Sequence, residues 1–348
     1  MKKVITAKFK LIKLLGKILL PIILLFLPFL LIAFSISPKF FAFVLRLVYD
    51  RQFSVPPKEF LYTDTVKSIT DINYGDGYKE ILDLHLPAQT NGTCPLIIWV
   101  HGGAYVAGYR GYVTFYARVL AHYGYAVAAI DYTLAPEAQY PMPLVQIGKA
   151  YTFLTTEDYE GKAFVDTSKI FFAGDSAGAQ LVAQFALLQT NQTYRHAFQN
   201  THPDSPLPDI ISADVLKGLL LYCGPFSLKD LQKTPNKLLK FLFWQMSWAY
   251  FGKRRTAKIS ALDEVDVIPH LTADFPPSFI TDGNALTFPK HGHALAAALK
   301  KLKVPTSTLI FDDPKNKVYH EFELDLKEPA AQKALLVALA FLKKYRDK

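Results

Sequence analysis

Ser176 stands at the centre of a glycine-flanked pentapeptide, Gly-Asp-Ser-Ala-Gly at residues 174–178. The apolar residues 171–173 precede this pentapeptide, and an apolar-periodic stretch from Ala179 to Thr190 follows it. A serine raised on a tight turn between a strand and a helix forms a nucleophile elbow, and the flanking glycines let strand and helix approach closely. A helix that begins near Ser176 also directs its free amides at the hydroxyl. We therefore predict that Ser176 is the nucleophile of an acyl-transfer reaction.

A second glycine motif follows the apolar run 96–100, where the chain reads His101-Gly102-Gly103-Ala104. Two adjacent glycines allow backbone amides to turn into a pocket. Together with the amide of Ala177, the amides of Gly102 and Gly103 are predicted to form an oxyanion hole, which stabilises the charge of a tetrahedral intermediate. Taken alone, the glycine pair also fits a simple tight turn after a strand.

The candidate general base is His320. This residue follows a polar loop at 312–317 and lies in the sequence Val-Tyr-His-Glu-Phe at residues 318–322. A neutral imidazole takes the serine proton and returns it to the leaving alcohol, and an ordinary pKa near 6.5 suits that role. His291, His293 and His101 are weaker candidates, because the first two lie near the start of a predicted helix and the third belongs to the glycine motif.

Length and composition indicate a globular protein that can bury one large core or two modest ones. The chain has 348 residues, 51% of them hydrophobic, which suits a domain of roughly 250 to 300 residues. The formal net charge is +9, but the lysines gather at the two ends of the chain, so we do not expect a nucleic-acid partner. Cys94 and Cys223 each lie at the edge of an apolar strand and are predicted to be buried thiols. No metal-ligand spacing or phosphate-binding glycine loop is present in the sequence, so no cofactor or metal is expected.

The N-terminal residues resemble a membrane segment. Ile18–Ile36 contains no charge and is dominated by Leu, Ile and Phe, which reaches the roughly 18 to 20 residues needed to cross a bilayer. We predict an uncleaved transmembrane anchor, with a cleaved signal peptide and a buried helix as alternatives. Lysines cluster before this run and few basic residues follow it, which places the N-terminus in the cytoplasm and the rest of the chain outside.

Three segments follow from this pattern. Residues 1–37 form the basic tail and anchor, and residues 61–348 form the catalytic domain. Between them, residues 38–60 carry apolar side chains at helical spacing, and Pro56-Pro57 ends the helix predicted there. This amphipathic segment is predicted to lie either on the bilayer or over the mouth of the active site.

Beyond residue 61 the chain alternates between strands and helices. The first two strands are predicted to form a hairpin around residues 74–77, and residues 191–209 are predicted to be a polar loop. Uninterrupted apolar strands separated by amphipathic helices indicate a mostly parallel sheet covered on both faces. The predicted strands are 65–72, 79–86, 96–100, 126–130, 170–173, 215–223, 278–281 and 306–311, and the predicted helices are 112–123, 144–154, 179–190, 288–302 and 330–345.

Three motifs in this order resemble the hormone-sensitive-lipase-like branch of the α/β-hydrolase family. They are the His-Gly-Gly-Ala motif at 101–104, Asp-Tyr-Thr-Leu-Ala-Pro-Glu at 131–137 with Tyr140-Pro141, and the serine pentapeptide at 174–178. The resemblance extends from about Tyr62 to the C-terminus and implies an eight-stranded α/β-hydrolase sheet. It also implies a small helical cap, built from the N-terminal segment and an insertion at about 225–267. The aromatic residues of that insertion fit either an acyl-pocket wall or the core face of a helix.

The acid of the predicted triad departs from the family pattern. Counted without gaps from Pro277, the acid expected from the resemblance falls on Leu286. Asp282 lies four residues earlier and is the only acid in that turn, and Gly283 allows the bend that would aim it at the histidine. We therefore predict Asp282 as the acid, with Asp230 and the absence of a triad acid as alternatives.

These residues predict a membrane-anchored serine carboxylic-ester hydrolase. The resemblance implies short to medium acyl esters or small aromatic esters as substrates. An amidase or deacetylase of the cell envelope is a second hypothesis, suggested by the outward-facing anchor. The third is a surface-anchored binding protein that has lost efficient catalysis, and its support is the displaced acid.

Overall fold

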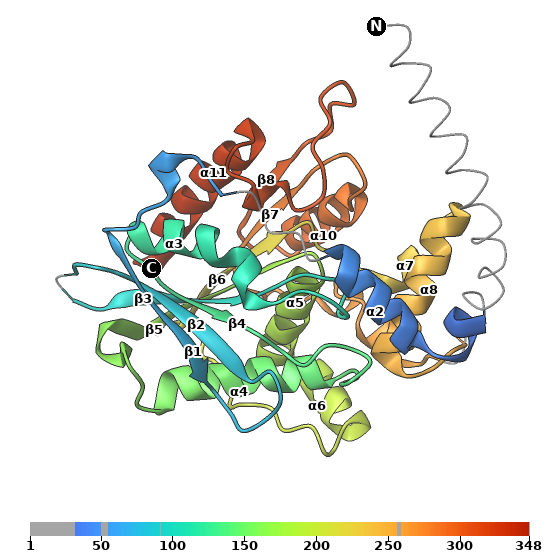
Figure 1. Cartoon of the computed structure of the whole chain (residues 1–348). Coiled ribbons are helices and arrows are strands. Elements are labelled where there is room, and N and C mark those ends of the chain that lie inside the picture. Colours follow the sequence, from blue (N-terminus) through green and yellow to red (C-terminus); the bar gives the residue numbers. More distant parts are fainter. Residues whose placement is uncertain (1–31, 50–54, 91, 256–258, 348) are drawn as a thin grey trace, which may run out of the picture.

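The computed structural model describes residues 32–49, 55–90, 92–255 and 259–347. An eight-stranded sheet runs through the centre, with helices on both of its faces (Figure 1). The strand order is β1-β2-β4-β3-β5-β6-β7-β8. Strands β3 to β8 are parallel, whereas β2 is antiparallel to both β1 and β4. The predicted α/β-hydrolase fold with a mostly parallel eight-stranded sheet is therefore confirmed.

The strands of this sheet are β1 Val66–Asn73, β2 Ile81–Pro87, β3 Cys94–Val100, β4 Ala126–Ile130, β5 Val165–Asp175, β6 Leu216–Tyr222, β7 Ser278–Asp282 and β8 Thr306–Ile310. Besides the helical residues 32–36, the α-helices of the described residues are α2 Pro38–Tyr49, α3 Thr114–His122, α4 Met142–Thr156, α5 Ala177–Thr190, α6 Gln192–Thr201, α7 Leu228–Leu231, α8 Lys237–Phe251, α9 Ala261–Glu264, α10 Pro289–Lys301 and α11 Pro329–Arg346.

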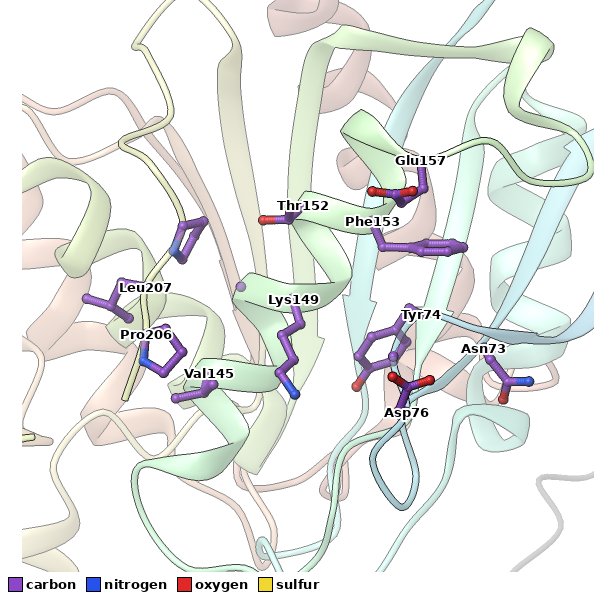
Figure 2. A pocket seen from close by; sticks show the side chains of 13 residues that line it. Asn73, Tyr74, Asp76, Val145, Lys149, Thr152, Phe153, Glu157, Pro206 and Leu207 are labelled. Carbon is purple, nitrogen blue, oxygen red and sulfur yellow. The ribbon is translucent and has the colours of Figure 1, made fainter. Parts of the chain in front are cut away.

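The predicted hairpin between β1 and β2 is confirmed. Its turn closes on Glu80, whose carbonyl accepts the amide of Tyr74 and whose carboxylate accepts the amide of Gly77. The turn, the outer side of α4 and residues 206–208 surround a cavity of about 590 Å³, and Figure 2 shows Tyr74, Asp76 and Lys149 around it. This cavity does not include Ser176 or His320.

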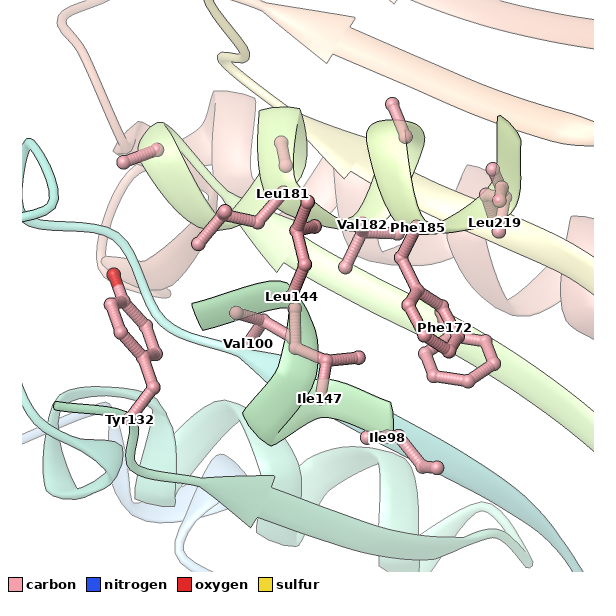
Figure 3. Close-up of a cluster of buried hydrophobic side chains, with 14 of the residues drawn as sticks. Ile98, Val100, Tyr132, Leu144, Ile147, Phe172, Leu181, Val182, Phe185 and Leu219 are labelled. Carbon is pink, nitrogen blue, oxygen red and sulfur yellow. The ribbon is translucent and has the colours of Figure 1, made fainter. Parts of the chain in front are cut away.

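Two apolar layers cover the sheet, and the central strands supply side chains to both. In β3, Ile98 and Val100 belong to one cluster and Ile97 and Trp99 to the other, because successive side chains of a strand point to opposite faces. Figure 3 shows the first cluster, in which side chains of α4 and α5 pack on β3 and β5. Burial on both faces explains why these strands have uninterrupted apolar sequences.

Residues 191–209 contain a helix, so the prediction of a polar loop there is wrong. Helix α6 begins at Gln192, and the side chain of the preceding Asn191 accepts the amide of Tyr194 as an N-terminal cap. Tyr194 and Phe198 lie one helical turn apart and are buried. Two apolar positions in an otherwise polar stretch gave too weak a periodic signal for the helix to be predicted.

The inserted residues 225–267 contain α7, α8 and α9, and α8 packs against α2. The two helices lie side by side at one end of the sheet (Figure 1). The aromatic side chains of α8 divide in their environment. Tyr250 is buried and stacks on Tyr105 with ring centroids 4.1 Å apart, whereas Phe243 is partly buried and lines a cavity beside α10. The core face predicted as one alternative is therefore present at Tyr250, whereas Phe243 lines a cavity.

Most of the predicted membrane span Ile18–Ile36 lies outside the described residues. Its last five residues, 32–36, are helical. Within the residues that the structure describes, no helix combines the length and the apolar character that crossing a bilayer requires.

The predicted amphipathic helix after this run is present as α2. Phe41 and Ala42 are buried, whereas Phe43, Leu47 and Val48 are exposed. Arg46 holds the helix to the domain: it donates to the carbonyl oxygens of Val106 and Ala135, and its guanidinium pairs with Glu137 at 2.6 Å.

Candidate active site

Ser176 occupies the sharp turn between β5 and α5, as the pentapeptide predicts. Its backbone has φ 50° and ψ −118°, a left-handed conformation that is costly for a residue with a side chain. The turn is possible because Gly178 lies against the end of β3: a Cβ on Gly178 would be 2.0 Å from the carbonyl oxygen of Val100. Likewise, a Cβ on Gly174 would be 2.5 Å from the carbonyl carbon of Gly178. The two glycines thus allow the close approach of strand and helix that raises Ser176.

His320 lies beside the serine. Its Nε2 is 2.8 Å from Oγ of Ser176, which is hydrogen-bonding distance for proton transfer. The ring of Phe288 meets the imidazole edge to face, with centroids 5.2 Å apart. Burial lowers the pKa of His320 to about 4, and the charge of Asp282 acts in the opposite direction. The expectation of an ordinary pKa is therefore not met, but at pH 7 the imidazole is neutral and able to accept a proton.

Asp282 reaches the histidine through a third residue. Oγ1 of Thr287 donates to Oδ1 of Asp282, and the same Oγ1 lies 2.8 Å from Nδ1 of His320. The carboxyl group is buried, and burial raises its pKa. The alternative acid, Asp230, is instead paired with Lys233 at 2.6 Å on the exposed side of α7.

The predicted oxyanion amides differ in their hydrogen bonds. The Gly102 amide donates to Oδ2 of Asp175 at 2.8 Å, so that amide is already engaged. In the part of the chain that the structure describes, no hydrogen bond uses the amides of Gly103, Ala104 or Ala177. Gly103 has φ 113° and Ala104 has φ 54°, so this loop turns sharply after β3. The amides of Gly103, Ala104 and Ala177 therefore remain available as hydrogen-bond donors.

Two carboxyl groups under the glycine loop were not predicted from the sequence. Asp175 accepts Trp99 Nε1–H at 2.8 Å besides the Gly102 amide, and Glu321 accepts the hydroxyl of Tyr49 at 2.9 Å. Burial, together with the charge of Glu321, raises the pKa of Asp175. Asp175 is part of the pentapeptide and Glu321 follows His320, but no sequence signature marks either residue as a buried carboxyl group beside the glycine loop.

The other candidate histidines lie outside the serine site. His101 bonds its own loop, with Nδ1 2.6 Å from the carbonyl oxygen of Gly102, and it stacks on Tyr132. His291 accepts the backbone amide of Ser227, and His293 pairs with Asp312 at 2.9 Å on the surface. These contacts fit structural roles.

A cavity of about 510 Å³ lies next to two residues that contact His320. Thr287 and Phe288, which both contact His320, form part of its wall. Leu231, Leu239 and Phe243 give this cavity an apolar lining. Its wall also carries polar side chains, among them Asp230, Lys233 and Lys290, and neither Ser176 nor His320 forms part of it.

Curated relatives match parts of the chain. A probable isoprenylcysteine alpha-carbonyl methylesterase of Oryza sativa subsp. japonica is 32% identical over 112 residues, which cover 32% of this chain and 25% of that protein. The kynurenine formamidase of Drosophila melanogaster is 26% identical over 172 residues, which cover 49% of each chain. The chain thus spans a quarter to a half of the length of these relatives.

Solved structures match nearly the whole chain. Esterase B from Lactobacillus rhamnosis has a TM-score of 0.69 and 21% identity, over 91% of this chain and 95% of that chain. A bacterial heroin esterase has a TM-score of 0.62 and 18% identity, over 90% and 93%. At these identities the likeness establishes the fold. The BD-FAE family model matches residues 82–296, which is more than half of the chain, and the chain therefore belongs to the BD-FAE family of α/β-hydrolases.

Proposed function

We propose that this protein is a serine hydrolase that cleaves carboxylic esters. The observation that carries the proposal is the 2.8 Å contact between Nε2 of His320 and Oγ of Ser176, on a serine held at positive φ between strand and helix. The esterases among the similar structures support the same reaction class.

In this reaction His320 removes the proton of Ser176 as Oγ attacks the ester carbonyl carbon. Charge develops on the carbonyl oxygen, where the free amides of Gly103, Ala104 and Ala177 stabilise it. The histidine then gives its proton to the leaving alcohol, and the acyl group stays on the serine. Water, deprotonated by the same imidazole, attacks the acyl-enzyme and releases the carboxylic acid.

The cavity beside Thr287 and Phe288 is the proposed acyl pocket, with Leu231, Leu239 and Phe243 as its apolar wall. Its volume of about 510 Å³ lies within the range of small-molecule sites. Short to medium acyl esters and small aromatic esters fit such a space. A second candidate, hydrolysis of an amide, is favoured by the similarity to a kynurenine formamidase.

The test compares the wild type with Ser176→Ala on p-nitrophenyl acetate, p-nitrophenyl butyrate and p-nitroformanilide. We expect the wild type to hydrolyse at least one ester and Ser176→Ala to retain only background hydrolysis. Faster turnover of the formanilide than of both esters would favour the amidase. Equal, slow hydrolysis by wild type and variant would contradict the proposed hydrolase function and favour a binding protein.

Asp282 is the proposed acid of this site, acting on His320 through Thr287. Asp282→Asn is expected to lower kcat by orders of magnitude with the fold retained. Asp230→Asn tests the alternative acid: because Asp230 lies on the wall of the proposed acyl pocket, this variant is expected to keep the wild-type kcat and to change only KM. The opposite result would move the acid to Asp230.

The uncharged run Ile18–Ile36 and the lysines before it also support a membrane anchor with the hydrolase domain outside the cytoplasm. A protease added to intact cells should then remove the domain. Complete protection in intact cells, with cleavage after permeabilisation, would overturn the outward orientation.

A further inference from the structure

We infer that Thr287 is the positioning residue through which Asp282 fixes the tautomer of His320. This inference rests on the proposed serine-hydrolase function and adds to it a residue that the sequence motifs do not identify. The site then holds four side chains in a row, with a hydroxyl between the acid and the base.

The hydrogen-bonding groups allow one arrangement when the acid is ionised. A carboxylate only accepts, so the single hydroxyl proton of Thr287 is donated to Oδ1 of Asp282. Oγ1 of Thr287 is 2.8 Å from Nδ1 of His320, and with its proton already committed it accepts from Nδ1–H. A neutral imidazole has one N–H, so Nε2 is then unprotonated and accepts the serine proton.

The reaction uses this row without moving protons along it. Nε2 takes the proton of Ser176, and the resulting imidazolium keeps its Nδ1–H on the oxygen of Thr287. The dipole of the hydroxyl and the carboxylate behind it stabilise the positive ring. No proton leaves Nδ1, Thr287 or Asp282, so the step balances with the transfer from Oγ to Nε2 alone.

The backbone around Thr287 is built to hold this position. The amides of Asn284 and Ala285 donate to the carbonyl oxygen of Val318, and the amide of Val318 donates to Oδ1 of Asn284. A Cβ on Gly283 would lie 2.3 Å from that same carbonyl oxygen. The turn after β7 is thus fastened to the segment that leads into the general base.

Two further observations support a link from Asp282 to His320 through the hydroxyl of Thr287. Leu286, where the family pattern places the acid, is 82% exposed with φ 55°, so it turns away from the site and Thr287 comes next. Within the residues that the structure describes, Oδ2 of Asp282 is buried and has no hydrogen-bond partner. The carboxylate therefore depends on the hydroxyl of Thr287 for its link to the histidine.

Two substitutions at Thr287 separate a hydroxyl role from a packing role. Thr287→Val keeps the shape and removes the hydroxyl, whereas Thr287→Ser keeps the hydroxyl and removes the methyl group. We expect Thr287→Val to lower kcat on p-nitrophenyl butyrate by on the order of 100-fold with KM changed less than about threefold, as for loss of the correct tautomer. Thr287→Ser is expected to stay within about threefold of the wild type.

The opposite pattern, with Thr287→Ser impaired and Thr287→Val near normal, would overturn the inference and assign the residue to packing. Equal activity of both variants and the wild type would also overturn it. A second measurement does not depend on the folding of either variant: ¹⁵N NMR of wild-type protein with labelled histidine, with His320→Gln for assignment. We expect the Nδ1–H tautomer at neutral pH, and an Nε2–H tautomer would contradict the row of bonds.

Ser176→Ala assayed beside these variants distinguishes the two failures. If Ser176→Ala retains full activity, the proposed function fails, and the tautomer of His320 still reports on Thr287. If Ser176→Ala is inactive while Thr287→Val equals the wild type, the proposed function stands and the inference about Thr287 is wrong.

Discussion

The substitution Gly178→Ala tests the geometry that raises the nucleophile. A Cβ at this position would lie 2.0 Å from the carbonyl oxygen of Val100, where ordinary contacts begin at 3.4 Å. The carbonyl oxygen belongs to the backbone at the end of β3, and the Cβ would be attached to the backbone of the first turn of α5. Neither backbone can move without moving its strand or helix. The added methyl group can be accommodated only if strand and helix separate by roughly 1 Å or more, because a buried core has no free volume to absorb it.

Two effects follow from this separation. Overpacking of a core costs about 1 to 3 kcal/mol, and a contact this short between two backbones lies at the upper end, so we expect the free energy of unfolding to fall by about 3 kcal/mol. A displacement of about 1 Å at a reacting group lowers the rate on the order of 100-fold. We therefore expect kcat on p-nitrophenyl butyrate to fall by about that factor.

The measurements are urea unfolding and steady-state kinetics on full-length protein. Gly92→Ala is the matched control, because a Cβ at Gly92 would meet no atom within 4 Å, and it should leave both quantities unchanged. If Gly178→Ala matched the wild type in stability and in kcat, the close approach of helix and strand would not be what positions the serine.

Three more predictions follow from individual contacts. Because burial lowers the pKa of His320 to about 4, kcat/KM should stay level from high pH down to about pH 5 and halve near pH 4; a midpoint near the ordinary histidine pKa would contradict this. Burial also lowers the pKa of His85 to about 4, so the unfolded chain takes up this proton first and stability falls as pH drops below about 6.5. Between pH 7 and pH 5, the free energy of unfolding of His85→Gln, measured in urea, should fall by about 2 kcal/mol less than that of the wild type. Equal decreases in the two proteins would contradict the lowered pKa of His85. Arg46→Ala removes the pairing with Glu137 and should speed hydrogen exchange in α2, which Lys39→Ala should not do; equal exchange in both variants would show that α2 is held by packing alone.

The parts of the site that steric rules govern were predictable from the sequence. The pentapeptide around Ser176 needs glycines because helix and strand meet there, and the structure places Gly174 against Gly178 as that rule requires. The position of His320 follows from the order of elements, since it comes after the last strand. The mostly parallel sheet was predictable because its strands are buried on both faces and therefore have uninterrupted apolar sequences.

Hydrogen-bond partners across the fold could not be predicted in this way. The motif assigned the Gly102 amide to an oxyanion hole, but Asp175, 73 residues later in the chain, accepts it. The contacts of Thr287 with Asp282 and His320 could not be predicted, because a hydroxyl between an acid and a base has no sequence pattern. Asp282 was predicted only as the single acid of its turn, and its link to His320 runs through Thr287, which follows the outward-turned Leu286.

Covalent labelling of Ser176 tests the central claim most directly. An alkyl fluorophosphonate reacts when the activated serine oxygen attacks phosphorus and fluoride leaves, so it reports the nucleophile and its base without assuming the natural substrate. Mass spectrometry of the intact, full-length protein should show one phosphonyl group per wild-type chain and none in Ser176→Ala. After digestion, the group should be on the peptide that contains Ser176. An unlabelled wild type, or equal labelling of wild type and variant, would contradict the assignment of Ser176 as an activated nucleophile.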